Sequence, residues 1–330
     1  MEMLRLVNSQ SVKDKRMLEQ QMQIGLDAVE ERLSAVITCD VDTLRDASLH
    51  IISSGGKRVR PRVALLAYLA SGGQNILDAV DAACAMEMIH TASLVHDDIN
   101  DHSALRRGKI SVHERWGRTF ALLTGDYMFT KVYELMASYG VAANKVMAHA
   151  ATTLVEGETL QASAAKAGEM NRETYKKVIE RKTASLFVAA AELGSLIAGG
   201  DEETRQALSD YGKYLGSTFQ IVDDILDLIG DPEEMGKPRG LDVAQNRGVA
   251  IAHANGIAVQ EAVAVAPAPV ADDPITRMLN KLRESGAVEV ARVQADIMAQ
   301  KARDALSQVP PSPAVDELAA LIEQVIDRKK

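Results

Sequence analysis

The sequence predicts an all-α protein in which long helices pack around one core. Proline breaks helix interiors, and no proline occurs between Pro61 and Pro232. Within that stretch, apolar residues recur at helical spacing. No segment combines period-two alternation with the turn residues of a β-hairpin. We therefore expect the 330 residues to form a single large helical domain.

Glycines mark the expected helix ends, because glycine readily adopts the left-handed conformation that terminates a helix. One helix should begin near Asp81 and run to the acidic residues 97–101, and a strongly apolar helix should cover residues 184–198. A third carries an apolar stripe of Leu208, Tyr211, Leu215, Phe219, Val222, Leu226 and Ile229. The breaks fall at Gly72-Gly73, Gly108, Gly117, Gly140, Gly168 and Gly199-Gly200.

The composition changes after Asp242. Residues 257–274, IAVQEAVAVAPAPVADDP, are rich in Ala, Val and Pro and predict a loop or connector. Two further helices are expected, over residues 275–306 and 314–328, with the break PPSP between them.

Charge and cysteine usage restrict the classes of function. The net charge of −9 and the pI near 5.4 disfavour a nucleic-acid partner. Cys39 and Cys84 show no zinc or disulfide spacing, which favours a reducing cytoplasm. The N-terminus lacks the apolar core of a secretory signal, and the helix over 184–198 is short and carries Glu192. We expect a cytoplasmic protein without a transmembrane segment.

Two aspartate clusters follow apolar helices. The first is His96-Asp97-Asp98-Ile99-Asn100-Asp101. At about 100° per residue, its acids share one helix face, roughly 80–100° wide, with Glu87 and His90. The second cluster is Asp223-Asp224-Ile225-Leu226-Asp227, and Gln220 lies on the same face as its aspartates. Each cluster gathers carboxylates on a single helical turn.

Such a turn favours a divalent cation. Neighbouring carboxylates repel one another, so their pKa values should rise, and the end of a helix is itself unfavourable for acids. A bound cation resolves both problems, and carboxylates that leave room for water and phosphate oxygens suit Mg²⁺. One cluster alone would be ambiguous, because surface helices often carry two or three acids. Two clusters favour a metal site, and neither has the loop spacing of an EF-hand.

Basic groups suited to phosphate lie nearby in the sequence. They are Gly55-Gly56-Lys57-Arg58-Val59-Arg60-Pro61, Arg106-Arg107-Gly108-Lys109, Lys182-Thr183 and Gly236-Lys237-Pro238. Arginine pairs bidentately with phosphate oxygens and lysine supplies a compact charge. Each group alone would usually be solvated surface, and GGKR is too short for a P-loop. Together with two aspartate clusters in an acidic protein, they predict a site for a diphosphate held through magnesium.

At this point the chain resembles the trans-isoprenyl diphosphate synthases, or polyprenyl synthetases. The matching stretches are GGKRVRP (55–61), EMIHTASLVHDDINDHSALRRGK (87–109), LLTGDYMF (122–129), EGETLQ (156–161), KTASLF (182–187), FQIVDDILD (219–227) and GKPRGLD (236–242). The resemblance implies an all-α fold of the isoprenoid-synthase type, with helices around a deep central cavity, and a homodimer. It also implies a trans-prenyltransferase that condenses an allylic diphosphate with isopentenyl diphosphate.

The resemblance also implies roles for individual residues. Gly56, Lys57, Arg60, His90 and Arg107 would bind isopentenyl diphosphate. Arg106, Lys182, Gln220 and Lys237 would bind the allylic diphosphate. Magnesium, three ions per site with substrate bound, would be held by Asp97, Asp98, Asp101, Asp223 and Asp227, the last two from a facing helix. The catalytic set would be Asp97, Asp98, Asp101, Lys182, Thr183, Gln220 and Asp223, with Thr183 and Gln220 near the developing allylic cation.

Residues before the first aspartate cluster bear on product length. In the family, bulky aromatics there block long products, whereas Ala92 and Ser93 are small; Met86 and Ile89 lie farther along the same flank. We expect a hexaprenyl to decaprenyl product, with geranylgeranyl diphosphate as the alternative. The family's usual Lys and TLP segment is replaced by VAQNRGVAIA, and residues 243–330 resemble the family only loosely.

Two other classes of function compete with this interpretation. A terpene cyclase would not need Lys57 and Arg60, and its second metal motif differs from an aspartate triplet. A non-catalytic subunit of a heteromeric synthase typically lacks one aspartate cluster, whereas both are intact here. The altered C-terminal segment keeps the subunit alternative open. A long prenyl product also suggests transfer to a membrane.

Overall fold

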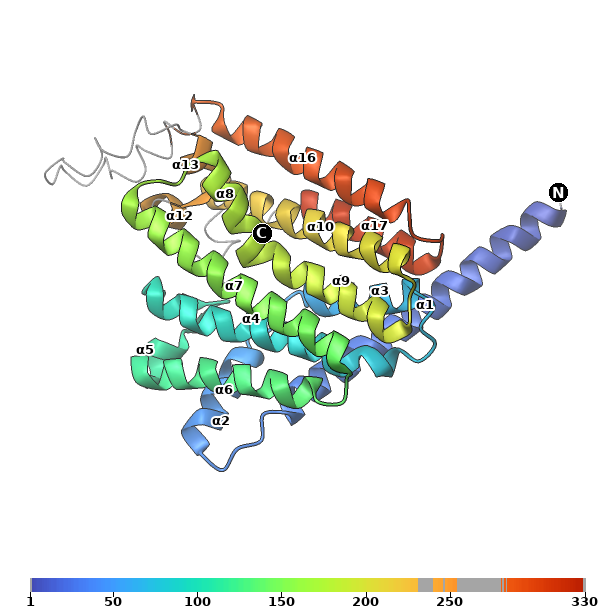
Figure 1. Cartoon of the computed structure of the whole chain (residues 1–330), viewed down its shortest axis with the longest axis horizontal. Coiled ribbons are helices and arrows are strands. Elements are labelled where there is room, and N and C mark those ends of the chain that lie inside the picture. The colour runs from blue at the N-terminus through green and yellow to red at the C-terminus, as the bar shows by residue number, and fades with distance from the viewer. Residues whose placement is uncertain are drawn as a thin grey trace, which may run out of the picture. The chain divides into compact units, whose positions relative to one another are not determined.

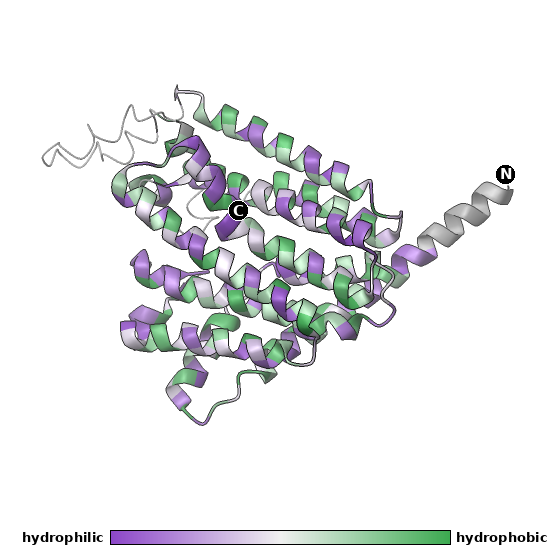
Figure 2. Cartoon of the chain, viewed as in Figure 1, coloured by the Kyte–Doolittle hydropathy of each residue, from purple (hydrophilic) through white to green (hydrophobic). Residues whose placement is uncertain are grey.

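The chain is all-α, as the sequence predicts. A computed structural model describes residues 2–230, 240–245, 247–253, 280, 282 and 284–328. Most of these residues are helical, and the strands among them form one short hairpin (Figure 1). Figure 2 shows hydrophobic and hydrophilic residues alternating along individual helices, as amphipathic packing requires.

Contacts divide the chain into two compact units. Unit 1 contains Met1–His149, Val188–Ser209 and Ala305–Ala319. Unit 2 contains Ala150–Phe187, Asp210–Asp304 and Ala320–Lys330. That the whole chain forms one domain around a deep cavity stays a prediction.

Unit 1 is built around one buried helix, α4. Its first elements in chain order are α1 (Glu2–Ala35), α2 (Asp42–Ile52), α3 (Val59–Ala70), the short 3-10 helix η1 (Ile76–Ala79), α4 (Val80–Asn100), α5 (Val112–Trp116) and α6 (Arg118–Met136). Helix α4 packs against α1, α3 and α6, and the last of these runs beside it in Figure 1. Helix α4 is apolar around much of its circumference until its final, acidic turns, and most of its side chains are therefore buried.

A hairpin follows α4. Strand β1 (Leu105–Arg106) pairs antiparallel with β2 (Lys109–Ile110). Arg107 and Gly108 form the turn with φ of 51° and 75°, the positive values that a two-residue type I′ turn requires. The prediction that the chain has no hairpin and that Gly108 ends a helix was therefore wrong. Strands of two residues are too short to show alternation.

The remaining helices contribute wholly or partly to unit 2. They are α7 (Val141–Ala167), α8 (Arg172–Ile179), the π-helical turn η2 (Glu180–Ala184), α9 (Ser185–Ala198), α10 (Glu202–Ile229), α12 (Leu241–Ala244), α13 (Gly248–His253), α16 (Ala287–Leu306) and α17 (Pro313–Ile326). In the core of this unit, Ile221 and Ile225 of α10 pack with residues of α8, α13 and α16. The turns of α10 that carry the second aspartate cluster therefore also contribute apolar side chains to this core.

The other helix boundaries mostly follow the sequence. Glycines 72, 117, 140, 168 and 199 lie at or just beyond helix ends, as predicted. The predicted helix over 275–306 is interrupted: residues 280, 282 and 284 are helical, but Gly286 has a φ of 76°, and α16 begins after it. Residues 275–279 lie outside the described residues. The predicted connector 257–274 lies outside the described residues.

The apolar helix over 184–198 is α9, and its side chains are mostly buried, as predicted. In the described part of the chain, no helix is both long and apolar enough to cross a membrane. Cys39 and Cys84 are both free thiols.

Candidate active site

The first aspartate cluster is the last turn of α4. Asp101 caps the helix, and its amide donates to the Asp97 carbonyl at 2.8 Å. Asp98 is only 1% exposed, and its Oδ1 accepts from Arg106 Nε at 2.9 Å. Burial raises the pKa of Asp98, although the Arg106 guanidinium opposes the shift. Within the described residues, the buried Oδ2 of Asp98 has no hydrogen-bond partner.

The hairpin brings its basic residues to two different places. Arg106 points to Asp98, as described above. Arg107 Nη1 donates to the carbonyl of Gly55, and Lys109 Nζ donates to the carbonyl of Ser53 at 3.0 Å. The hairpin therefore links the end of α4 to the loop between α2 and α3, which contains GGKR, the first part of the sequence GGKRVRP.

That loop depends on its two glycines. Gly55 and Gly56 have φ of 79° and 155°. A Cβ on Gly56 would lie 2.8 Å from Arg107 Nη1, so the side chain of Arg107 occupies the space that any larger residue would need. Lys57 is exposed on the loop, whereas Arg60, in the first turn of α3, is buried.

His90 lies on α4, two turns before Asp97. Burial lowers its pKa well below the usual range, and the positive charges of Arg60 and Arg107 lower it further. A neutral imidazole therefore lies among cations in unit 1. Four of the five residues assigned to isopentenyl diphosphate are linked here. Arg107 packs against Gly56, and the charges of Arg60 and Arg107 act on His90.

In unit 2, Lys182 and Thr183 lie in the π-helical turn η2. π-Turns are frequent at functional sites because the extra residue redirects side chains. A Cβ on Gly157 would overlap the backbone nitrogen of Lys182, so only glycine lets α7 approach this turn so closely. Lys182 Nζ donates to Glu158 Oε2 at 2.7 Å and to Gln161 Oε1 at 2.9 Å. The EGETLQ and KTASLF stretches therefore meet at one place.

Thr183 is joined to the second aspartate cluster. Its hydroxyl donates to Gln220 Oε1 at 2.6 Å, and Gln220 Nε2 donates to Asp224 Oδ1 at 2.8 Å. Asp224 Oδ2 also accepts from Tyr175 OH at 2.7 Å and from the amide of Val249 at 2.9 Å. Burial, with a contribution from Asp242, raises the pKa of Asp224 to about 8 despite these three donors. Hydrogen bonds from three residues of the protein thus fix the Asp224 carboxyl group in place.

Asp223 and Asp227 have different partners. Arg328 Nη1 lies 3.1 Å from Asp223 Oδ1, and the Arg328 guanidinium covers the ring of Phe219 at 4.3 Å. Asp227 is buried, and its Oδ2 accepts from the amide of Asp242 at 3.2 Å. Arg328 and Tyr175 were not predicted as site residues, because both are distant in sequence from the cluster that they contact.

No group of three or more His, Cys, Asp and Glu side chains among the described residues is arranged to hold a metal ion. A magnesium ion at either turn would therefore need oxygens from substrate or water, as is common for this ion. Lys237, assigned to the allylic diphosphate, lies outside the described residues.

The four residues tied to product length lie on α4. Met86, Ile89 and Ala92 are completely or almost completely buried. Ser93 is also buried, and its hydroxyl donates to the carbonyl of His90 at 2.8 Å. The flank before Asp97 therefore lies in the interior of unit 1 rather than at its surface.

Comparison with known proteins gives consistent matches along the chain. The polyprenyl synthetase family model matches residues 41–255. The chain is 34% identical to octaprenyl diphosphate synthase of Escherichia coli (strain K12), covering 92% of this chain and 94% of that enzyme. It is 33% identical to heptaprenyl diphosphate synthase component 2 of Bacillus subtilis (strain 168), covering 92% and 88%. The crystal structure of a polyprenyl synthase from Caulobacter crescentus CB15, complexed with calcium and isoprenyl diphosphate, matches with a TM-score of 0.88 and 31% identity over 96% of this chain and 98% of that one.

Proposed function

Since the chain belongs to the polyprenyl synthetase family and is a prenyltransferase, we propose that it condenses an allylic diphosphate with isopentenyl diphosphate to give a hexaprenyl to decaprenyl diphosphate. The observation that carries the proposal is that both aspartate turns are intact and built into buried polar networks. Asp98 is held by Arg106, and Asp223 lies next to the network of Gln220, Asp224 and Tyr175.

The proposed site for isopentenyl diphosphate is in unit 1. Lys57, Arg60 and Arg107 would pair with diphosphate oxygens, and Gly56 would let the backbone approach the ligand. His90 would complete the site. Because several cations already crowd His90, a bound diphosphate would relieve their mutual repulsion, which favours binding of the anion here.

The residues at the aspartate turns fit a magnesium-bound allylic diphosphate. The buried Asp98 Oδ2 accepts no hydrogen bond within the described residues, so it is an oxygen that suits a cation. Asp97, Asp98 and Asp101 would hold the metal in unit 1, and Asp223 and Asp227 in unit 2, with three ions per site when substrate is bound. When bound, magnesium neutralises charge on the departing diphosphate.

The chain's own residues have three tasks in the reaction. Lys182 and Arg106, with Lys237, would bind the allylic diphosphate as its C–O bond breaks. The oxygens of Thr183 and Gln220 would stabilise positive charge on the allyl group. The double bond of isopentenyl diphosphate then forms the new C–C bond, and a proton passes to the released diphosphate. The site must exclude water, which would otherwise capture the cation.

The proposed product length rests on α4. Ala92 and Ser93 leave the flank before Asp97 without a bulky side chain, and Met86 and Ile89 would set a limit farther along it. The names of the Escherichia and Bacillus relatives, octaprenyl and heptaprenyl synthase, support a medium-length chain. Geranylgeranyl diphosphate remains the alternative product.

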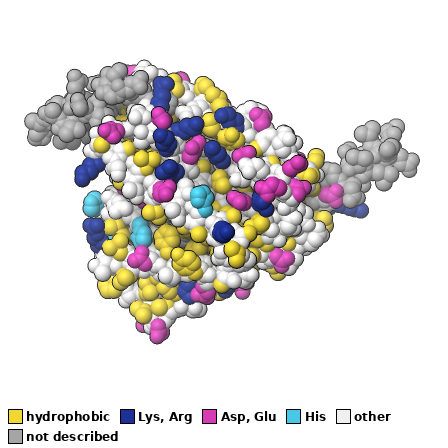
Figure 3. Space-filling view, viewed as in Figure 1, with side chains coloured by type: hydrophobic (Ala, Val, Ile, Leu, Met, Phe, Trp, Pro, Cys, Tyr) yellow, Lys and Arg dark blue, Asp and Glu magenta, His cyan; other side chains and the backbone are white. Residues whose placement is uncertain are grey.

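We also propose a cytoplasmic homodimer that passes its product to a membrane. Phe120, Leu123 and Tyr133 of α6 and Val141 at the start of α7 are exposed, and hydrophobic side chains gather over the α6 region in Figure 3. Exposed apolar patches of this kind often pack against a second subunit. The Bacillus relative is named as component 2, so a heteromeric subunit is the competing proposal. Sedimentation of the purified chain would distinguish a dimer from a monomer.

The decisive experiment supplies the purified chain with labelled isopentenyl diphosphate, farnesyl diphosphate and Mg²⁺, and resolves the products by chromatography. We expect a ladder that ends at one long product. Asp97→Ala and Asp223→Ala should each lower the rate by about 10²-fold or more. Asp27→Ala, at an exposed position of α1, is the matched control and should have no effect. Absence of elongation with any primer would contradict the proposal and favour the non-catalytic subunit.

A further inference from the structure

Arg58 lies at the centre of the GGKRVRP segment, where the loop ends and α3 begins, between two residues with proposed substrate contacts, Lys57 and Arg60. It precedes the first residue of α3 and has φ 48° and ψ 39°, a left-handed conformation that is uncommon for a residue with a side chain. Its side chain is only 8% exposed. A strained backbone and a buried charge persist together only where the surroundings hold both in place.

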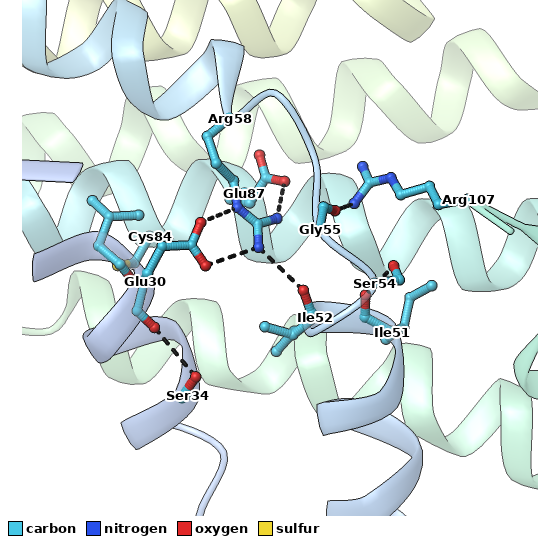
Figure 4. Close-up of polar contacts among 11 residues, drawn as sticks. Glu30, Ser34, Ile51, Ile52, Ser54, Gly55, Arg58, Cys84, Glu87 and Arg107 are labelled. Atoms are coloured by element: carbon cyan, nitrogen blue, oxygen red, sulfur yellow. Dashed lines mark hydrogen bonds and ion pairs between the residues drawn. The ribbon is translucent and has the colours of Figure 1, made fainter. Parts of the chain in front are cut away.

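Two carboxylates and one carbonyl surround the guanidinium (Figure 4). Arg58 Nε and Nη2 donate to the two oxygens of Glu30 at 2.5 and 3.1 Å. Nη1 donates to Glu87 Oε1 at 2.7 Å, and Nη2 also donates to the carbonyl of Ile52 at 3.1 Å. These contacts use four of the five N–H donors of an arginine, so Arg58 has little left to offer a substrate.

These partners come from separate elements of unit 1. Glu30 belongs to α1, Ile52 ends α2 and Glu87 lies on α4. Arg58 therefore joins three helices to the first residues of a fourth, α3. Burial alone would lower the pKa of Arg58, but Glu30 and Glu87 together raise it above its ordinary value, so Arg58 stays charged. Because Glu87 is itself almost completely buried, the ion pair has little screening by solvent.

The geometry connects Arg58 to the residues that would bind isopentenyl diphosphate. Glu87 precedes His90 by one turn of α4. The contact between Arg58 and Glu87 therefore holds the loop at the part of α4 that carries His90. On the other side of the loop, Arg107 holds Gly55, as Figure 4 shows. The loop is therefore fixed at both ends of the segment that contains Lys57.

We propose that Arg58 is a positioning residue for isopentenyl diphosphate: it binds Glu30 and Glu87 and thereby places Lys57 and Arg60 around the diphosphate without touching it. This inference rests on the proposed function. It assigns to the middle basic residue of the loop a role different from that of its two neighbours, although all three carry the same charge.

The test is steady-state kinetics of Arg58→Met, with the concentration of each substrate varied in turn. The KM for isopentenyl diphosphate should rise by about tenfold or more, while the KM for the allylic diphosphate changes by less than about twofold. Arg58→Lys should recover part of the loss, because lysine keeps the charge but lacks the fork that binds both oxygens of Glu30. Calorimetric titration with isopentenyl diphosphate alone should show the same order of affinities.

Arg45→Met is the matched control, since Arg45 is also ion-paired, with Asp42 at 2.7 Å, but lies at the surface of α2. It should leave both KM values unchanged. Glu30→Gln tests the same inference if Arg58→Met does not fold. The Glu30 side chain is 52% exposed, and Arg58 would keep its hydrogen bonds to Glu87 and to the carbonyl of Ile52. We expect a few-fold rise in the KM for isopentenyl diphosphate alone.

Parallel losses of kcat and of both affinities, or an unchanged KM for isopentenyl diphosphate in folded variants, would overturn the inference. An inactive wild-type chain would instead contradict the proposed function, so the two failures are distinguishable.

Discussion

The guanidinium of Arg328 lies 3.1 Å from the carboxylate of Asp223, just beyond the end of α17. Asp223 is a proposed magnesium ligand, and Arg328 also covers the neighbouring Phe219. A protein cation thus already offsets part of the negative charge on this aspartate turn. Metal binding at Asp223 must compete with that ion pair.

Arg328→Ala should therefore lower the Mg²⁺ concentration needed for half-maximal activity. Because Asp223 is partly exposed, the pair is partly screened, and we expect a change of about two- to fivefold. The measurement is a Mg²⁺ titration of the initial rate at saturating substrates. Arg303→Ala, which removes the ion pair with Glu323 at 2.7 Å, is the control. An unchanged or higher Mg²⁺ requirement would show that Arg328 does not compete with the metal.

Removing the hydroxyl of Tyr175 should destabilise unit 2. Tyr175 is buried, and its hydroxyl donates to the buried Asp224 at 2.7 Å. Tyr175→Phe leaves that carboxyl with one donor fewer, which should lower the free energy of unfolding by about 1–3 kcal/mol. Urea denaturation would measure the change. Tyr133→Phe is the control: it keeps the apolar ring of a residue that is 75% exposed in the single chain, so it should have little effect. Equal stability of the two variants would refute the importance of this bond.

Local sequence signals accounted for the helices and for both aspartate turns. Residues 97, 98 and 101 share a face because helical geometry relates positions one and four apart, whatever the tertiary structure. The long apolar segment of α4 and the glycine at position 117 set boundaries by equally local rules. Those features could be predicted from the sequence for that reason.

Contacts between distant segments could not be predicted in this way. Nothing in the sequence around Arg58 indicates that Glu30 approaches it, since the two are 28 positions apart. The π-helical turn at Lys182 was missed as well, and so was its close packing against Gly157 of α7, a contact between segments distant in sequence. The hairpin after α4 was missed because its strands have two residues each.

His90 gives a prediction about pH. Its pKa is lowered in the folded protein, whereas in the unfolded chain it should be near the ordinary value of about 6.5. Below that pH the unfolded state binds the proton and the folded state does not. The contribution of His90 to stability is thus fully present above about pH 6.5 and is lost as the pH falls towards the folded pKa.

An NMR titration should find that His90 stays neutral at pH values where an exposed histidine is already protonated. His90→Gln should lessen the loss of stability between about pH 6.5 and 5. Normal titration of His90 near pH 6.5 would contradict the prediction.

Ser93→Phe should shorten the product. Ser93 is a small buried residue one turn before Asp97, and a phenyl ring there would obstruct the flank that leads to Ile89 and Met86. We expect the main product to lose at least one isoprene unit, read by chromatography of the extracted lipids. The melting temperature of the variant should be measured as well. A folded variant with an unchanged product distribution would show that the growing chain does not pass Ser93.

Gly157→Ala should impair unit 2 through backbone overlap alone. The added methyl group would overlap the backbone nitrogen of Lys182 and the Cβ of Arg181, and backbone atoms have little freedom to move aside. We expect a loss of about 1–3 kcal/mol in the free energy of unfolding, as for other overpacked interiors. Because the same shift displaces Lys182 from Glu158 and Gln161, kcat should fall as well.

Gly140→Ala, at the position just before α7, is the control for the added methyl group itself. A Cβ at Gly140 meets no atom within 4 Å, so the same chemical change is made without overlap. Its stability and kcat should equal those of the wild type, measured by urea denaturation and initial rates. If both variants behave alike, the close approach of α7 to the π-helical turn has no energetic importance. If only Gly157→Ala is impaired, the glycine of EGETLQ is required because it lets α7 support the turn that carries Lys182 and Thr183.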